Sequence, residues 1–359
     1  MQLNDIIRTL EKVAPPRLAD EGDKTGLQVG DASSDISKVI VAVDPTPAVI
    51  DHAVDSGSDL LISHHPLIFN PLETLAAGTS VKDSVIKLIK ADIALYAMHT
   101  NYDSAPGGIN DVLADRLGVR VMGLLTTRHR EKKLKLAVFT PPEAIDAIRD
   151  AMAEAGAGII GNYTHCSFRS DGMGTFVPLP GSEPYVGEIG RLQEEAEYKL
   201  EMIVPEWRLS QVLDTMIEKH PYEEVAYDIY PLENEPYSYG YGRVGRLAKP
   251  MKLSEFRQVV EESLESQQIR MIGNQDKPVE VVALCGGGGK RLIPDAFAAG
   301  ADVYVTGDVG HHDFLDADAL GLAVIDAGHY ETERPGMELL AAKLSSEYAG
   351  ESVTVEFIK

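Results

Sequence analysis

The chain has 359 residues and a mass of 39.0 kDa, more than a usual single domain, so we expect two or three folded units. Its 33 Lys and Arg residues stand against 56 Asp and Glu residues, and the net charge of -23 would repel a phosphate backbone. We therefore expect no nucleic acid as a primary partner. The two cysteines, Cys166 and Cys285, provide neither a disulfide framework nor a CxxC metal site.

The first residues lack the basic start and apolar core of a signal peptide. No apolar run reaches the length of about 18 residues that a membrane-spanning helix requires. We expect a cytoplasmic protein without a membrane partner.

Residues 1–130 alternate between strand and helix patterns. Ile6, Leu10 and Val13 recur at near-helical spacing, and Pro15 and Pro16 end that helix. Further patterns predict strands at 38–44, 59–65 and 93–99 and helices at 46–57, 80–91 and 108–118. Such alternation predicts right-handed crossovers and a mostly parallel sheet, that is, an α/β lobe.

Residues 131–236 follow a different order. They predict a strand at 134–140, a helix at 142–156, further strand-like pieces, a strand at 197–204, a helix at 209–220 and a strand at 225–230. This β-α-β-β-α-β order predicts an inserted ferredoxin-like (α+β) domain.

The α/β pattern resumes over 237–359. It predicts strands at 279–284, before Gly307, before Gly328 and at 352–358, with helices at 290–299 and 330–348. Metal-type residues flank the insert and are scarce within it. We therefore expect the two flanks to fold as two α/β lobes with a site between them.

Six of the ten histidines follow predicted strands: His64, His65, His99, His311, His312 and His329. In an open α/β sheet, ligands bind at the carboxyl ends of the strands. One such pair could simply hydrogen-bond to nearby backbone, but the repetition along the chain favours a common site.

The strongest local pattern pairs a histidine with a carboxylate four residues later. His329 and Glu333 share one face of a predicted helix, about 5.4 Å apart along its axis, and His99 and Asp103 have the same spacing. Imidazole nitrogen and carboxylate oxygen suit a divalent ion such as zinc, manganese or iron without selecting one. The alternative is a solvated ion pair in a first helical turn.

Other motifs leave alternatives open. His311, His312 and Asp313 could be ligands, catalytic acid/base groups or a simple helix start, and we favour a role in catalysis or behind the ligands. Asp308 and Asp326 are candidate helix caps.

Two glycine-rich stretches fail the tests for nucleotide-binding motifs. Residues 240–245 fit G-x-G-x-x-G, but no strong strand pattern precedes them and no helix pattern follows. Residues 285–291 do not fit the Walker A pattern. The glycines at 286–289 could cradle an anion with backbone N–H groups or form a tight turn.

Four motifs together resemble the GTP cyclohydrolase 1 type 2 family, also called NIF-three-like. They are Ser63-His64-His65-Pro66, Met98-His99-Thr100-Asn101-Tyr102-Asp103, Gly307-Asp308 with His311-His312-Asp313, and Gly328-His329 with Thr332-Glu333-Arg334. The resemblance covers both flanks. The insert resembles the PII- or CutA-like domain of longer family members, through its element order and Pro221-Tyr222-Glu223-Glu224.

The resemblance implies a two-metal centre at the junction of the two α/β lobes, in homohexamers shaped as a hollow ring. It also implies a set of metal ligands, namely His64, His65, Asp103, His329 and Glu333. His99 is implied as a less certain neighbour. The family name implies opening of the guanine ring of GTP.

Two functions follow as hypotheses. The first is a metal-dependent hydrolase with two divalent ions (Zn, Mn or Fe) acting on a nucleotide or another phosphorylated or heterocyclic small molecule. In that case His99, His311 and His312 are candidate catalytic residues. The second is a non-catalytic metal-binding scaffold or regulator that senses a small molecule through the inserted domain.

We expect Glu333 to bridge the two ions. Neighbouring residues of a strand point to opposite faces, so His64 and His65 would hardly serve one ion equally. A carboxylate can bridge two ions and an imidazole nitrogen cannot. Asp103 is expected in a loop, where it would bind one ion terminally.

Overall fold

The computed structural model describes all residues, 1–359, and the chain divides into two compact units. One contains residues 1–129 and 239–359, and the other contains residues 130–238. The short strands β6 (His129–Glu131) and β11 (Tyr237–Tyr239) pair where the chain passes between the units. Both cysteines are free, and no helix combines the length and the apolar character needed to cross a membrane.

The larger unit contains a five-stranded sheet with the order β1-β4-β3-β2-β17. Its strands are β1 (Gly26–Val29), β2 (Lys38–Ala42), β3 (Leu60–Ser63), β4 (Ala94–Ala97) and β17 (Thr354–Phe357). All neighbours are parallel except β1 and β4. This confirms the α/β character predicted for the first part of the chain.

Helices cover both faces of this sheet. Helices α1 (Leu3–Val13) and α11 (His329–Glu347) enclose one hydrophobic core, which contains Leu10, Ile62 and Leu340. Helices α2 (Pro47–Asp55) and α3 (Ser80–Lys90) enclose the core on the other face. Leu3, Ile6 and Leu10 of α1 recur every three or four positions and are fully buried, which explains why this segment forms a packed helix.

The same unit contains a six-stranded sheet with the order β13-β16-β15-β14-β12-β5. Its strands are β5 (Val119–Leu124), β12 (Arg243–Lys252), β13 (Arg270–Ile272), β14 (Pro278–Leu284), β15 (Val303–Thr306) and β16 (Ala323–Asp326). Strands β14, β15 and β16 are parallel, and the other pairings are antiparallel.

Two hydrophobic cores cover the faces of the second sheet. One contains residues of α5 (Ile109–Arg116) and α8 (Leu253–Leu264), and the other contains residues of α9 (Ile293–Ala298) and α10 (His311–Leu320). A short helix, α4 (Thr100–Ser104), precedes α5. Three-residue 3-10 helices occur at η1 (Pro16–Leu18), η2 (Glu206–Arg208) and η3 (Lys290–Leu292).

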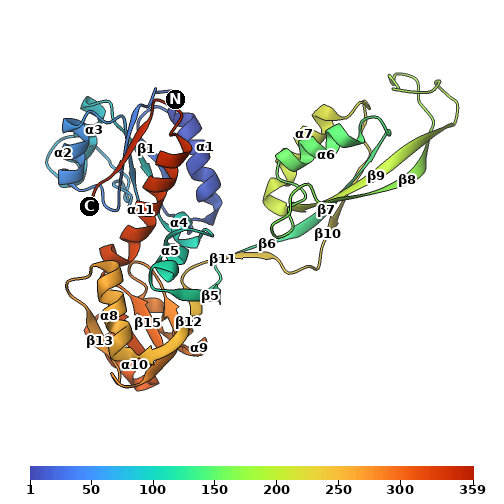
Figure 1. The fold of residues 1–359 in the computed structure, drawn as a ribbon. Coiled ribbons are helices and arrows are strands. Elements are labelled where there is room, and N and C mark those ends of the chain that lie inside the picture. The colour runs from blue at the N-terminus through green and yellow to red at the C-terminus, as the bar shows by residue number, and fades with distance from the viewer. The chain divides into compact units, whose positions relative to one another are not determined.

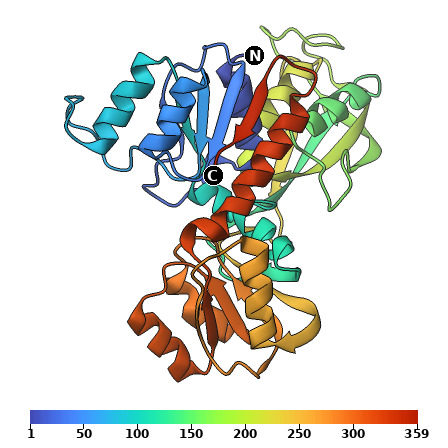
Figure 2. The same ribbon diagram turned by 60° about the vertical axis from the view of Figure 1, so that its left-hand side comes forward.

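The sheets do not follow the predicted lobes 1–130 and 237–359. Strand β5 belongs to the second sheet, where it pairs with β12, and β17 belongs to the first sheet, where it pairs with β2. Figures 1 and 2 show α11, in red, running from the six-stranded to the five-stranded sheet, so that the chain ends on the first sheet. Each sheet therefore contains strands from both sides of residues 130–238, and both sheets belong to one unit.

The unit of residues 130–238 contains one antiparallel sheet with the order β10-β7-β9-β8. Its elements are β7 (Lys133–Thr140), α6 (Ile145–Glu154), β8 (Ser167–Phe176), β9 (Gln193–Pro205), α7 (Leu209–Lys219) and β10 (Tyr227–Pro231). Leu136, Met202, Ile148 and Met216 form part of its separate core. The element order agrees with the order predicted from the sequence.

Candidate metal centre

The ends of strands from both sheets meet in the larger unit. His64 and His65 follow β3, and His329 begins α11 directly after β16. The Nε2 atoms of His65 and His329 lie 3.2 Å apart, although 264 residues separate them in the chain. The structure thus brings together five predicted ligands and His99, whereas the sequence could only place each at a strand end.

Glu333 lies at the centre of the cluster and is only 3% exposed. Its Oε1 atom is 3.1 Å from Nε2 of His329 and 3.5 Å from Nε2 of His64. Its Oε2 atom is 3.4 Å from Nε2 of His65. The two oxygens of one buried carboxylate therefore face three imidazole nitrogens.

The donor atoms form two overlapping groups. His64, His65 and His99 form one, and His65, His329 and Glu333 form the other, with all donor atoms of a group within 4.8 Å of one another. Oδ1 of Asp103 is 3.7 Å from Nε2 of His64. His99 is therefore placed among the candidate donors.

Two local expectations are wrong. His64 and His65 do not diverge, because β3 ends at Ser63 and both side chains lie beyond the regular strand. Their ring centroids are 5.0 Å apart, and both rings approach Glu333. Asp103 lies on α4, for which His99 is the N-cap, and not in a loop.

Each histidine ring is held by a hydrogen bond at its outer nitrogen, Nδ1. The partners are Met98 O for His64 (2.7 Å), Asp44 for His65 (2.9 Å), Asp23 for His99 (2.8 Å) and Asp308 for His329 (2.7 Å). An acceptor at Nδ1 fixes the proton there and leaves the Nε2 lone pair directed at the cluster.

The carboxylates behind the rings were not predicted as site residues. Asp308 was interpreted as a helix cap, but it accepts from His329 in a left-handed conformation, with φ of 56°. Asp44 follows the end of β2, so its position after a strand could have marked it as a site residue. Asp23 precedes β1 and lies 76 residues from His99, so no local pattern connects the two.

The carboxylates and histidines of this cluster shift one another's pKa values. Burial alone would lower the pKa of His64, but the Glu333 and Asp103 carboxylates outweigh it and raise the pKa to about 9. The hydrogen bond with Glu333 raises the pKa of His329 to about 10. Burial opposes ionisation of Glu333, yet His64 and His329 hold its pKa below the usual range. Any cation bound here competes with protons for the same atoms.

The donor set fits a divalent cation. Three buried atoms, Nε2 of His64, Oδ1 of Asp103 and Oε2 of Glu333, make no hydrogen bond. A buried polar atom without a partner costs about 1–3 kcal/mol. When both rings are neutral and carry their proton on Nδ1, the Nε2 lone pairs of His65 and His329 face each other at 3.2 Å. A cation would satisfy all these atoms, and mixed nitrogen and oxygen donors suit zinc, manganese or iron.

The glycine-rich loop covers the cluster. The N–H groups of Gly286, Gly287 and Gly289 donate to the side chains of Asn110, Thr332 and Thr306. Because these three donors already have partners, the tight-turn interpretation is favoured over an anion cradle.

A glycine is required at position 287, because the backbone there lies close to two candidate ligands. Its φ is +65°, and a Cβ atom there would lie 2.1 Å from Oε1 of Glu333 and 3.2 Å from Nε2 of His329. A side chain at this position would therefore occupy the space that these two donors share.

We expect Gly287→Ala to disturb the cluster as well as the backbone. Gly107→Ala is the matched control, because the φ of Gly107 is +70° and a Cβ atom there would have no neighbour within 4 Å. Both variants should lose about 1–3 kcal/mol of unfolding free energy through left-handed strain. Only Gly287→Ala should also lose bound metal, as checked by urea unfolding and elemental analysis. Equal metal content in the two variants would contradict this view of the loop.

A cavity of about 300 Å³ opens beside the cluster. Its walls include His65, His99, Asp103, His329, Glu333, Arg128, Tyr241 and Arg291. His311 and His312 are not among its lining residues. Both are exposed at the start of α10, with ring centroids 5.3 Å apart.

Comparison with known proteins places this chain in a family. Residues 1–359 match the model of Duf34/NIF3 (NGG1p interacting factor 3). The chain belongs to the Duf34/NIF3 family. Its relatives in Bacillus subtilis (strain 168) and Halalkalibacterium halodurans are each named GTP cyclohydrolase 1 type 2 homolog. The first is 44% identical over 341 residues, 95% of this chain and 91% of the relative. The second is 42% identical over 324 residues, 90% and 87% of the two chains.

Solved structures of NIF3-related proteins share the fold. A crystal structure of a Bacillus cereus protein related to NIF3 has a TM-score of 0.90 and 40% identity, and the match covers 100% of this chain and 97% of the other. The Staphylococcus aureus protein SA1388 has a TM-score of 0.76 and 28% identity, with 100% and 96% coverage. The similarity therefore extends over both units of this NIF3 chain.

Proposed function

We propose that this NIF3 chain is a hydrolase that depends on two divalent metal ions. One observation carries the proposal: the two oxygens of buried Glu333 face different histidines of two overlapping donor groups beside an open cavity. The proposed ligands are His64, His65, Asp103, His329 and Glu333.

Two ions held at this position would lower the pKa of bound water and polarise the bond to be cleaved. The chain's own residues fix the geometry. Asp44 and Asp308 hold the rings of His65 and His329, so that these donors need not reorient when a substrate enters. Burial of Glu333 keeps its carboxylate among the histidines rather than in solvent.

His99 is the strongest of the three predicted catalytic histidines. It lines the cavity, and Asp23 holds its Nδ1 atom, so its Nε2 atom is available to a ligand or to a metal ion. His311 and His312 do not line the cavity, and the geometry of one chain gives them no contact with the cluster. We propose that His99 binds a metal ion or transfers a proton. We propose no direct catalytic role for His311 and His312.

The substrate is proposed to be a small molecule that carries negative charge. Arg128 and Arg291 line the cavity, and a guanidinium group suits phosphate. Arg128 also contacts Asp20, 3.2 Å away, which would hold it in place. A nucleotide agrees with this lining, and the names of the relatives make GTP the first compound to test.

The proposal extends to the second unit and to assembly. The β-α-β-β-α-β order of residues 130–238, with the sheet order β10-β7-β9-β8, supports a ferredoxin-like insert of the PII/CutA type. A cytoplasmic homohexamer is proposed from the family resemblance alone. The competing function is a non-catalytic metal-binding scaffold in which the insert senses a small molecule.

Hydrolysis assays with His65→Ala test the proposal. Purified protein should turn over GTP or a member of a phosphoester panel only with added Mn, Zn or Fe. His65→Ala should reduce turnover to background, because His65 belongs to both donor groups. His312→Ala, outside the cavity, is the matched control and should retain activity. Tight metal binding without any turnover would instead support the scaffold.

A further inference from the structure

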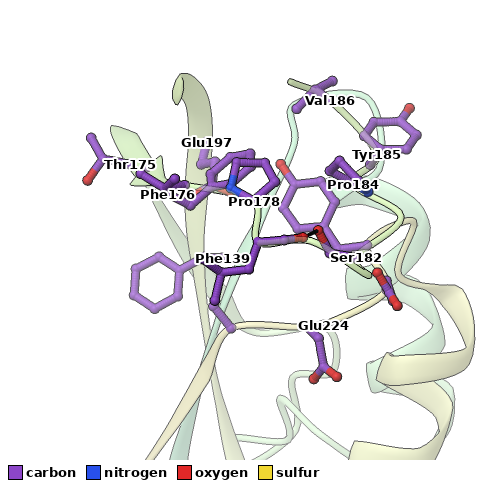
Figure 3. Close-up of a pocket in the computed structure, with 16 residues that line it drawn as sticks. Phe139, Thr175, Phe176, Pro178, Ser182, Pro184, Tyr185, Val186, Glu197 and Glu224 are labelled. Atoms are coloured by element: carbon purple, nitrogen blue, oxygen red, sulfur yellow. Dashed lines mark hydrogen bonds between the residues drawn. The ribbon is translucent and has the colours of Figure 1, made fainter. Parts of the chain in front are cut away.

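The unit of residues 130–238 contains a second cavity, of about 440 Å³. Figure 3 shows its walls, which come from β7, from the end of β8 with the loop that follows it, from β9, and from the segment before β10. Four aromatic side chains line it, those of Phe139, Phe176, Tyr185 and Tyr222. Val177, Pro178, Leu179, Pro184, Val186 and Ala226 add apolar surface. The volume is sufficient for a small organic molecule.

The charged groups of the cavity wall are all acidic. Glu197, Glu223 and Glu224 line it, and no Lys, Arg or His side chain does so. The wall beside the metal centre differs, because two arginines accompany the carboxylates there. An anionic ligand would be repelled here, and a cation would be attracted.

Glu197 is the carboxylate that the fold directs to this cavity. On the neighbouring strand, Gly174 leaves room for it, because a Cβ atom at Gly174 would lie 2.1 Å from Oε2 of Glu197. Tyr222 lies beside Glu197, and burial together with that carboxylate raises the pKa of the Tyr222 hydroxyl. An aromatic ring and a glycine thus fix one carboxylate at the apolar wall, on the same side as Phe176 and Pro178 in Figure 3.

The other two glutamates are engaged or directed elsewhere. Oε2 of Glu223 accepts the backbone N–H of Glu183 at 2.8 Å, which ties the loop to this segment. The carboxylate of Glu224 points away from the aromatic side chains in Figure 3. Glu197 therefore remains as the counter-charge for a ligand.

We propose that this cavity binds a small organic cation, an amine whose ammonium group meets Glu197 and whose apolar or aromatic body lies against the rings. Tyr185 and Tyr222, with ring centroids 5.7 Å apart, present two aromatic surfaces to it. Aromatic rings attract cations through their faces, and a charge-assisted hydrogen bond to a carboxylate is stronger than a neutral one. The site lies wholly within residues 139–226 and needs no metal.

Three probes of similar shape and different charge test the ligand class. Phenethylamine is cationic, phenethyl alcohol is neutral and phenylpropionate is anionic, and all carry the same ring on a short chain. Titrated calorimetrically into the full-length protein, the amine should bind at least about tenfold more tightly than the alcohol. The anion should bind more weakly than both.

Two variants locate the binding. Glu197→Gln should weaken amine binding about tenfold and leave alcohol binding unchanged. Gly174→Ala keeps the net charge but displaces the carboxylate, so it should cause the same selective loss. Glu218→Gln, an exposed position on α7, makes the same change as Glu197→Gln away from the cavity and should have no effect. Circular dichroism and thermal unfolding of each variant check that the unit remains folded.

The proposal is overturned if the amine binds no more tightly than the alcohol, or if no probe binds. It is also overturned if folded Glu197→Gln protein binds the amine as the parent does. Selective loss in both Glu197→Gln and Gly174→Ala, with Glu218→Gln unchanged, supports it.

Discussion

Replacing Glu333 by glutamine is expected to reduce the metal content from the two ions per chain that we propose to one or none. The amide keeps nearly the same shape but offers one neutral oxygen, so it cannot offset the charge of two dications. Its NH₂ group would also face one of the histidine nitrogens that now lie 3.1–3.5 Å from the carboxylate. Elemental analysis of protein purified without chelators measures the loss, and any hydrolysis should be lost with the metal.

Glu347→Gln is the matched control for that experiment. It makes the same chemical change on the same helix, α11, far from the cluster in sequence and near the helix end. Its metal content should equal that of the parent, and the circular dichroism of both variants should be unchanged. If Glu333→Gln retained both ions, the bridging role would pass to Asp103, whose Oδ1 atom also lies near His64.

Local signals in the sequence indicated part of the candidate site, and the family resemblance implied the full ligand set. His64 and His65 end an apolar strand, and His329 and Glu333 are one helical turn apart at a strand-to-helix junction. The distance between the His65 and His329 nitrogens could not be predicted in this way, because it depends on two sheets meeting within one unit. The same holds for Asp23 behind His99, since the pair is made by tertiary packing alone.

The fold could be predicted from the sequence where the spacing of apolar residues is regular. The apolar runs of β3 and β15 and the amphipathic helix α1 were placed correctly. Strand β12 was missed because glycine, arginine, lysine and proline interrupt its alternation, and it is stabilised by neighbours on both sides, β14 and β5. Helix α10 was predicted only as one alternative, a helix start at His311, because it buries only one residue fully, Ala317, and shows little amphipathic pattern.

Arg243→Met is expected to cost about 3–5 kcal/mol of unfolding free energy in the larger unit. Arg243 begins β12, is 3% exposed, and forms a two-point ion pair with Asp111 of α5, at 2.6 and 2.8 Å. Its other contacts are the backbone oxygens of Gly240, Gly242 and Ala105. Methionine fills much of the volume but leaves Oδ1 of Asp111 and the carbonyl of Gly240 without a donor. The other acceptors keep backbone N–H donors.

Arg246→Met on the same strand is the control. Arg246 pairs with Glu280, but its side chain is 52% exposed, so water replaces the lost partner. The expected cost is below about 1 kcal/mol. Urea unfolding followed by far-ultraviolet circular dichroism compares the two variants. Similar costs for both would show that burial of the Arg243 pair contributes little.

The single tryptophan separates the two units in this experiment. Trp207 lies in the unit of residues 130–238, so its fluorescence reports that unit, whereas Arg243 belongs to the other. If the units unfold independently, Arg243→Met should shift part of the far-ultraviolet dichroism transition and leave the tryptophan transition in place. A common shift of both transitions would show that the units unfold together.

The unfolding free energy lost in Arg243→Met should also depend on pH in a defined direction. Burial opposes ionisation of Asp111, but the hydrogen bonds and charge of Arg243 outweigh it and lower the pKa of Asp111 in the folded state. A carboxyl with a lowered pKa stabilises the fold above its unfolded pKa of about 3.9 and loses that contribution as the pH falls through the folded value. In Arg243→Met the half-buried carboxyl of Asp111 can take up a proton, which relieves part of the penalty in acid. The difference between parent and variant should therefore be largest near neutral pH and shrink below about pH 4; a constant difference would mean that lost packing, not charge, destabilises the variant.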